Sequence, residues 1–107
     1  MVTDIKTVTK LSKKYIKDVK NVMHIDEAYL YGSYAKGIQK KDSDVDICFF
    51  SKNFSKRRRI DVLAELFNLT RKYNKSVFIE PNAFPLSELK NDNPFVKEVI
   101  ETGIRLI

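Results

Sequence analysis

The stretch that decides the fold runs from Tyr31 to Phe50 and reads YGSYAKGIQKKDSDVDICFF. It opens at the end of a short apolar segment, residues 27–31, which we predict to be a strand. It closes on residues 44–50, DVDICFF, which are apolar enough to predict a second strand in the middle of a sheet. Between the two strands, GSYAKG at residues 32–37 is bounded by two of the three glycines and predicts a turn.

Asp44 and Asp46 are the first candidate functional residues in this stretch. Side chains two residues apart on a strand point to the same face, so the two carboxylates would lie close together and repel each other. An apolar strand does not need such a pair for its core. A divalent cation relieves the repulsion, and Mg²⁺ prefers one or two carboxylates together with substrate phosphates. The pair predicts a metal site; solvated aspartates at a strand end are the plainer alternative.

Gly32 and Ser33 form the second candidate feature. A strand ends here, glycine permits an unusual backbone angle, and we predict that a helical turn begins at Ser33. Backbone N–H groups at such a turn can cradle a phosphate, and the Ser33 hydroxyl adds a donor. Tyr31 and Tyr34 flank the turn and are candidates to stack on a nucleobase. A phosphate cradle just before an acidic pair predicts metal-assisted phosphoryl or nucleotidyl transfer.

The rest of the chain adds helices and further strands around this centre. The order predicts an α/β (α+β) fold, a small mixed β-sheet flanked by helices. At 107 residues we expect a single domain over residues 1–107. We predict helices over residues 4–21, from Lys56 to Tyr73 and from Pro94 to Thr102, with strands over 76–80, closed by Pro81, and 104–107.

Composition narrows the function classes. Twenty Lys and Arg against 14 Asp and Glu give a net charge of +6, so an anionic partner or ordinary solubility both fit. Cys48 is the one cysteine and His24 the one histidine, which excludes an internal disulfide and a Cys/His metal site. The lysine-rich start has no apolar leader, and no segment is apolar enough to span a bilayer. We therefore expect a cytoplasmic protein without a membrane partner.

The glycine–serine turn and the acidic pair together carry a resemblance to a known family. The pattern Gly-Ser-x3-Gly-x6-Asp-x-Asp resembles the signature of the minimal nucleotidyltransferases of the DNA polymerase β superfamily. Gly32, Ser33, Gly37, Asp44 and Asp46 fall on its motif positions. The resemblance covers about residues 22–107 and implies a polymerase β-like nucleotidyltransferase fold.

The family implies a third carboxylate on the strand beside the Asp-x-Asp strand. Glu80 is the only acid on the third predicted strand, so it takes this position. The usual residue is aspartate, and a glutamate is longer by one methylene, which would shift the second metal or change its occupancy. The alternative for Glu80 is an ordinary acid at a strand end, before Pro81.

The resemblance also implies a mechanism. Asp44 and Asp46 would hold two Mg²⁺ ions, and Glu80 would assist the metal that activates the acceptor hydroxyl. The Gly32–Ser33 turn would bind the β- and γ-phosphates of a nucleoside triphosphate, expected to be ATP. Lys36 would pair with a phosphate, unless it is a solvated loop lysine. The acceptor would attack the α-phosphorus in line, and pyrophosphate would leave.

The family implies a partner as well. A chain of this size has no second domain to hold the base or the acceptor, and minimal members are often encoded beside a helical HEPN (higher eukaryotes and prokaryotes nucleotide-binding) protein as toxin–antitoxin pairs. We expect an antitoxin that transfers AMP from ATP to a tyrosine of a HEPN toxin. The alternatives are a non-catalytic antitoxin that neutralises its partner by contact, and transfer to a small molecule such as an aminoglycoside. Nucleic acid is the least favoured partner, although the basic run Lys56–Arg59 leaves it open.

Overall fold

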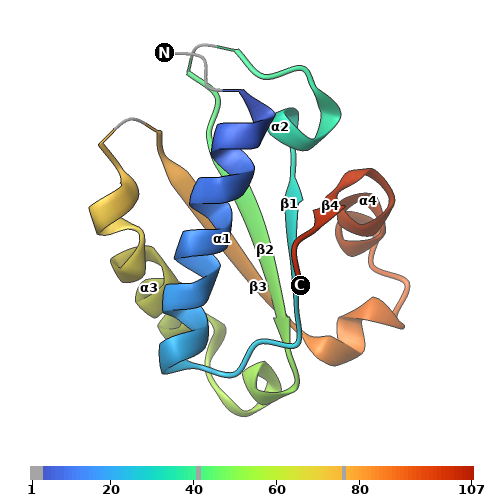
Figure 1. The fold of residues 1–107 in the computed structure, drawn as a ribbon. Coiled ribbons are helices and arrows are strands. Elements are labelled where there is room, and N and C mark those ends of the chain that lie inside the picture. Colours follow the sequence, from blue (N-terminus) through green and yellow to red (C-terminus); the bar gives the residue numbers. More distant parts are fainter. Residues whose placement is uncertain (1–3, 41, 76) are drawn as a thin grey trace.

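The computed structural model describes residues 4–40, 42–75 and 77–107, which form a four-stranded sheet with helices on both faces. Helices α1 (Ile5–Val22) and α3 (Arg59–Leu69) pack on one face, and α4 (Pro94–Thr102) packs on the other. In Figure 1, α1 crosses in front of the sheet, with α3 on the left and α4 on the right. In the described ranges, none of the helices has both the length and the apolar content that a bilayer crossing requires.

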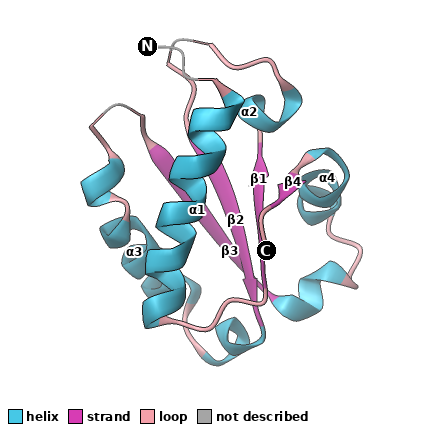
Figure 2. Ribbon diagram, in the orientation of Figure 1, coloured by secondary structure: helices cyan, strands magenta, loops and turns pink. Residues whose placement is uncertain are grey.

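The sheet is mixed, as the sequence predicts. Its strands are β1 (Glu27–Tyr31), β2 (Val45–Ser51), β3 (Ile79–Pro85) and β4 (Ile104–Arg105), in the spatial order β3-β2-β1-β4. β1 is antiparallel to β2 and β4, whereas β2 and β3 are parallel and are joined by the crossover that contains α3. Figure 2 shows the strands side by side between the helices. The end of β1 and the starts of β2 and β3 therefore lie together at one end of the sheet, where these strands begin or finish.

Residues along β2 alternate between two apolar clusters. Val45, Ile47 and Phe49 are buried in the cluster that includes α1 and α3. Cys48 and Phe50 are buried in the second cluster, which includes Val96 and Val99 of α4. Because successive strand residues point to opposite faces, the side chain of Asp46 belongs to the face that carries α4.

Helix ends follow local sequence signals. The Asp4 carboxylate accepts a hydrogen bond of 2.7 Å from the Thr7 N–H and caps α1. Asn93 caps α4, with its side chain accepting from the Phe95 and Val96 N–H groups, and Pro94 takes the first helical position. The predicted extent of this last helix is confirmed, and it stops at Gly103. There a Cβ would overlap the Val99 carbonyl oxygen and lie 2.9 Å from that of Leu30, so only glycine fits.

The third strand corrects a sequence prediction. We expected it over residues 76–80 with Pro81 as its end, but β3 begins at Ile79 and passes through Pro81 to Pro85; Ser76 lies outside the described residues. The physical reason is the position of β3 at the edge of the sheet, hydrogen-bonded to β2 alone. An edge strand tolerates proline because the missing N–H is not needed on its open side.

The basic run also behaves differently from the prediction. Lys56 ends a short 3₁₀ helix, η1 (Lys52–Lys56), and α3 starts only at Arg59. Two cations in extended backbone separate the two helices, which avoids a cluster of positive charge inside the first turn of α3. At the other end α3 stops at Leu69 and the chain continues as η2 (Arg71–Tyr73). The remaining elements are η3 (Leu86–Leu89) and the four-residue helix α2 (Ser33–Lys36).

Candidate active site

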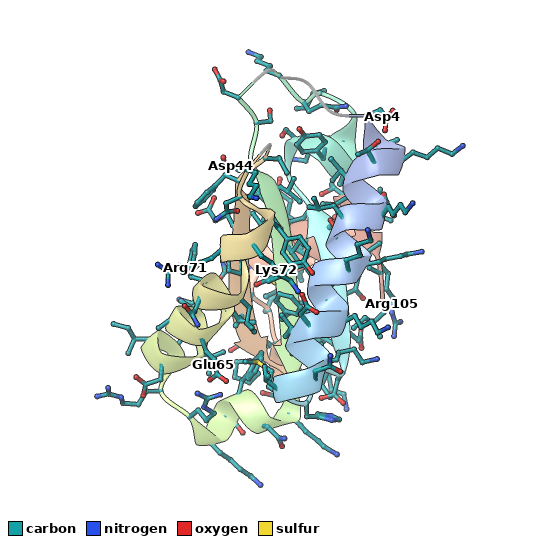
Figure 3. The ribbon with its side chains drawn as sticks, turned by 60° about the vertical axis from the view of Figure 1, so that its left-hand side comes forward. Asp4, Asp44, Glu65, Arg71, Lys72 and Arg105 are labelled. Atoms are coloured by element: carbon teal, nitrogen blue, oxygen red, sulfur yellow. The ribbon has the colours of Figure 1, made fainter. Side chains whose placement is uncertain are left out.

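The candidate catalytic residues lie at the end of the sheet where β1 finishes and where β2 and β3 begin. Tyr31 on β1 is the register partner of Asp46 on β2, and Asp46 is the partner of Glu80 on β3. These three residues form one row across the sheet. Asp44 immediately precedes β2, and Figure 3 shows it at the same end of the sheet. The sequence prediction that Glu80 lies on the strand beside Asp46 is thus confirmed, while its role in metal binding stays a prediction.

Asp46 has a raised pKa in this arrangement. Burial, the negative charge and hydrogen-bonding contact of Glu80, and the charge of Asp44 raise the pKa of Asp46 to about 7. Two carboxyl groups this close cannot both ionise easily without a compensating cation. The repulsion between two such carboxylates lowers the stability of the fold. Unfavourable charge pairs of this kind are typical of functional sites.

Gly32 brings the turn between β1 and α2 against this carboxylate. Its backbone has φ +75° and ψ −151°, a conformation that favours glycine. A Cβ at this position would overlap Oδ2 of Asp46 and lie 3.2 Å from its Cγ. The next residue, Ser33, starts α2 as predicted, so this helix begins directly after the glycine that lies against Asp46. The first turn of a helix leaves N–H groups without a helical partner. Gly37 then closes the helix with φ +71° in the left-handed region.

The residues present fit a hard divalent cation. Asp44, Asp46 and Glu80 offer only oxygen donors, and Glu80 is the register neighbour of Asp46 on the adjacent strand. In the part of the chain that the structure describes, no three His, Cys, Asp or Glu side chains converge on a ready-made metal cage. Mg²⁺ is usually held by one or two carboxylates plus substrate phosphates, so a nucleotide would complete such a site.

Two candidate residues lie differently from the sequence expectation. The Lys36 ammonium is 3.1 Å from the Glu98 carboxylate of α4, so it faces that helix in this structure, and its predicted phosphate contact stays a prediction. Tyr34 is only 2% exposed and belongs to the core on the α1 face, which rules out the predicted stacking on a base. The first turn of α2 rotates this ring inward. Tyr31 lies on the α4 face, with its ring 5.5 Å from that of Phe95 in an edge-to-face contact.

The sequence prediction missed a set of contacts that Arg59 makes with β3, the strand that carries Glu80. Arg59 reaches over the open edge of β3, donates from Nε to the Ala83 carbonyl oxygen at 3.1 Å and donates to the Asn82 side chain. Its guanidinium also lies 5.1 Å from the centre of the Phe84 ring. Burial raises the pKa of Tyr31, Asp46 adds to the rise, and a hydrogen bond with Asn82 opposes it. The signal that could have found these residues is the alternation of side chains along the third strand. If that strand is extended past Pro81, Asn82 and Phe84 fall on the same face as Glu80.

A comparison with protein families identifies the fold and the class of site. Residues 13–107 match the family described as "Polymerase beta, Nucleotidyltransferase". The chain belongs to this nucleotidyltransferase family. Gly32, Ser33 and Asp44 of the nucleotidyltransferase domain fall inside the matched residues, and so do Asp46 and Glu80, which we call the acidic row. The superfamily inferred from the sequence is confirmed, whereas the narrower minimal group and its HEPN pairing stay predictions.

Solved structures agree with the family at the level of the fold. A crystal structure from Sulfolobus solfataricus, of a protein provisionally assigned as a nucleotidyltransferase, matches 94% of this nucleotidyltransferase domain and 80% of its own chain. The TM-score is 0.62 and the sequence identity is 19%. At that identity the likeness shows a shared fold. No curated protein matches this domain significantly.

Proposed function

We propose that this domain is a Mg²⁺-dependent nucleotidyltransferase that moves AMP from ATP to a tyrosine hydroxyl of a HEPN toxin. The modification neutralises the toxin, so this domain acts as the antitoxin of the pair, and it does so in the cytoplasm. Membership of the polymerase β family supports nucleotidyl transfer as the reaction class. The nucleotide, the acceptor and the partner rest on the resemblance of the Gly-Ser and Asp-x-Asp motifs to the minimal group.

The contact between Gly32 and Asp46 is the observation that carries the proposal. One triphosphate must touch both a phosphate-binding turn and metal-binding carboxylates if its α-phosphorus is to react. The absence of a Cβ at Gly32 lets these two features meet without any gap. A turn with only a structural role would not need to stand against a carboxylate whose pKa is already raised by its neighbours.

Each part of the site has a task in the proposed reaction. Asp44, Asp46 and Glu80 would hold the cation, which supplies charge neutralisation on the phosphates and lowers the pKa of the acceptor hydroxyl. The N–H groups at the start of α2 and the Ser33 hydroxyl bind the β- and γ-phosphates. This grip fixes the α–β bond so that pyrophosphate leaves directly away from the entering oxygen.

A contact antitoxin without turnover is the second candidate. It is favoured by Glu80, which stands where the family has aspartate, and by the described residues holding no three-residue metal cage. Under that reading the domain would bind the same partner, and the carboxylates would be dispensable for neutralisation.

The test uses ATP labelled at the α-phosphate, Mg²⁺ and lysate of the host organism. Wild-type protein is compared with the Asp44→Ala/Asp46→Ala double variant and with Asp42→Ala, which removes an exposed acid from the preceding loop. We expect a labelled protein band with wild type and Asp42→Ala and none with the double variant. An acid-stable AMP adduct on a tyrosine of the labelled protein, located by mass spectrometry, would identify the linkage.

The contact reading predicts a different result. No label would form in any lane, and wild type and double variant would capture the same partner with equal affinity. That outcome would overturn nucleotidyl transfer for this chain.

A further inference from the structure

An exposed aromatic side chain, that of Phe78, lies two residues before Glu80 in the sequence. Phe78 is 46% exposed and directly precedes β3. Its carbonyl oxygen accepts a hydrogen bond of 2.8 Å from the Val45 N–H, which ties it to the peptide that follows Asp44. Among the residues that the structure describes, Phe78 joins neither apolar cluster. Its ring therefore contributes little to the core, and its position beside the site calls for another explanation.

Strand alternation, continued one residue before β3, places the Phe78 ring on the face that carries Asp46 and Glu80. Ile79 is fully buried towards α1 and α3, and Glu80 is exposed on the opposite face. Phe78 precedes Glu80 by two residues and so shares its side of the sheet. The pairing of β2 with β3 begins at Val45 and Ile79, and Asp44 and Phe78 are the residues that immediately precede this pair.

The direction of the reaction determines which substrate Phe78 meets. The phosphate-binding turn follows β1, the Asp-x-Asp pair opens β2, and Glu80 and Phe78 belong to β3 and its start. In-line displacement puts the entering and the leaving oxygen on opposite sides of the phosphorus. Pyrophosphate held on the β1 side requires the acceptor to enter from the β3 side. This step rests on the proposed function.

We propose that Phe78 is the acceptor-binding residue and that it selects an aromatic acceptor, the phenol side chain of a tyrosine. An exposed phenylalanine ring offers such a phenol an edge-to-face contact that a serine hydroxyl cannot make. In the reaction the phenol oxygen forms a bond to the α-phosphorus, and the α–β phosphoanhydride bond breaks. Pyrophosphate leaves with the electron pair, and the phenol proton passes to solvent water.

The experiment measures binding of defined product analogues by calorimetry in the presence of Mg²⁺. The probes are ATP, the 5′-adenylyl phenol ester of N-acetyltyrosinamide and the matched adenylyl ester of N-acetylserinamide. We expect wild type to bind the tyrosyl ester about five-fold more tightly than the seryl ester. Phe78→Ala removes this preference and leaves ATP affinity unchanged, whereas Phe78→Tyr keeps both.

Phe67→Ala is the matched control, because it removes a ring that is 37% exposed on α3, away from the acidic row. It should alter none of the three affinities, and an unchanged melting midpoint shows that each variant is folded. A wild type without preference for the tyrosyl ester, or a Phe78→Ala variant that weakens ATP equally, overturns the assignment of Phe78 and leaves nucleotidyl transfer standing. Failure of wild type to bind ATP or either ester overturns the proposed function itself.

Discussion

Oδ2 of Asp46 occupies the space that a side chain on Gly32 would need. The carboxylate that opens β2 and the turn that follows β1 are thus in direct contact, although they lie on opposite sides of the loop that joins the two strands. Because of this contact and the positive φ of Gly32, residue 32 cannot carry a side chain unless Asp46 moves.

Gly32→Ala is expected to abolish nucleotide binding. The new Cβ meets Asp46 and also forces an alanine into a backbone conformation that costs about 1–3 kcal/mol. We expect no measurable ATP binding by calorimetry and a lower melting midpoint. Gly37→Ala is the matched control: its φ is also positive, but no atom lies within 4 Å of the added Cβ. It should lose about 1 kcal/mol of stability and keep its affinity for ATP, and equal loss in both variants would contradict the role of the contact.

Asp46→Asn is expected to stabilise the protein at pH 8 in the presence of a chelator. A pKa raised to about 7 means that the folded state resists ionisation of this group, so its contribution to stability falls as the pH rises from about 4 to about 7. The asparagine avoids that cost, by about 2 kcal/mol after allowing for partial exposure. Urea unfolding at pH 8 and at pH 4.5 checks the sign, because the gain should disappear at the lower pH. Asp42→Asn, in the exposed loop, should change neither value.

Glu80→Gln is expected to raise the Mg²⁺ concentration needed for half-maximal transfer and to lower turnover at least about ten-fold. The amide keeps the size of the side chain and removes its charge from the row with Asp46. Glu80→Asp, which has the acid usual in the family, should retain activity. Titration of activity with Mg²⁺ separates the variants, and a Glu80→Gln protein with unchanged metal dependence would exclude Glu80 from the site.

Arg59→Ala is expected to lower the free energy of unfolding by about 1–2 kcal/mol. The guanidinium bonds to the Ala83 carbonyl and to Asn82 across the open edge of β3, and it covers the Phe84 ring. Arg59→Lys should not restore the loss, because a single ammonium cannot reproduce this planar set of contacts.

The neighbouring arginine is the control for this effect. Arg58 pairs with Asp61 on the surface, where their side chains are 78% and 51% exposed. Arg58→Ala should cost no more than about 0.5 kcal/mol in the same urea titration. Equal losses for the two arginines would show that the contacts of Arg59 with β3 contribute nothing specific.

The parts of the site that the sequence predicts are those governed by local periodicity. Alternation along one strand is enough to predict that Asp44 and Asp46 lie on the same face. The glycine before Ser33 is enough to predict the turn. The contact between Gly32 and Asp46 needs the register of β1 against β2, which is a tertiary property. The same limit explains Lys36, whose partner Glu98 comes from a helix at the far end of the chain.

The third strand shows where local signals mislead. Pro81 is a strong breaker in isolation, and only the edge position of β3 makes it harmless. Ending the strand there kept Glu80 in the site but concealed Asn82 and the arginine that holds it. Burial of Tyr34 was equally out of reach, because it depends on how a four-residue helix turns against the core.

The parallel pairing of β2 with β3 has a consequence for the folding kinetics of the molecule. Asp46 and Glu80 stand on opposite sides of the α3 crossover and become neighbours only after that long connection has closed. Contact between these two carboxylates therefore requires the crossover to be closed, and the contact is lost whenever the crossover opens. A ligand that bridges the two carboxylates would slow global unfolding and protect the crossover from proteases. Resistance of α3 to proteolytic cleavage would then report occupancy of a site on the other face of the sheet.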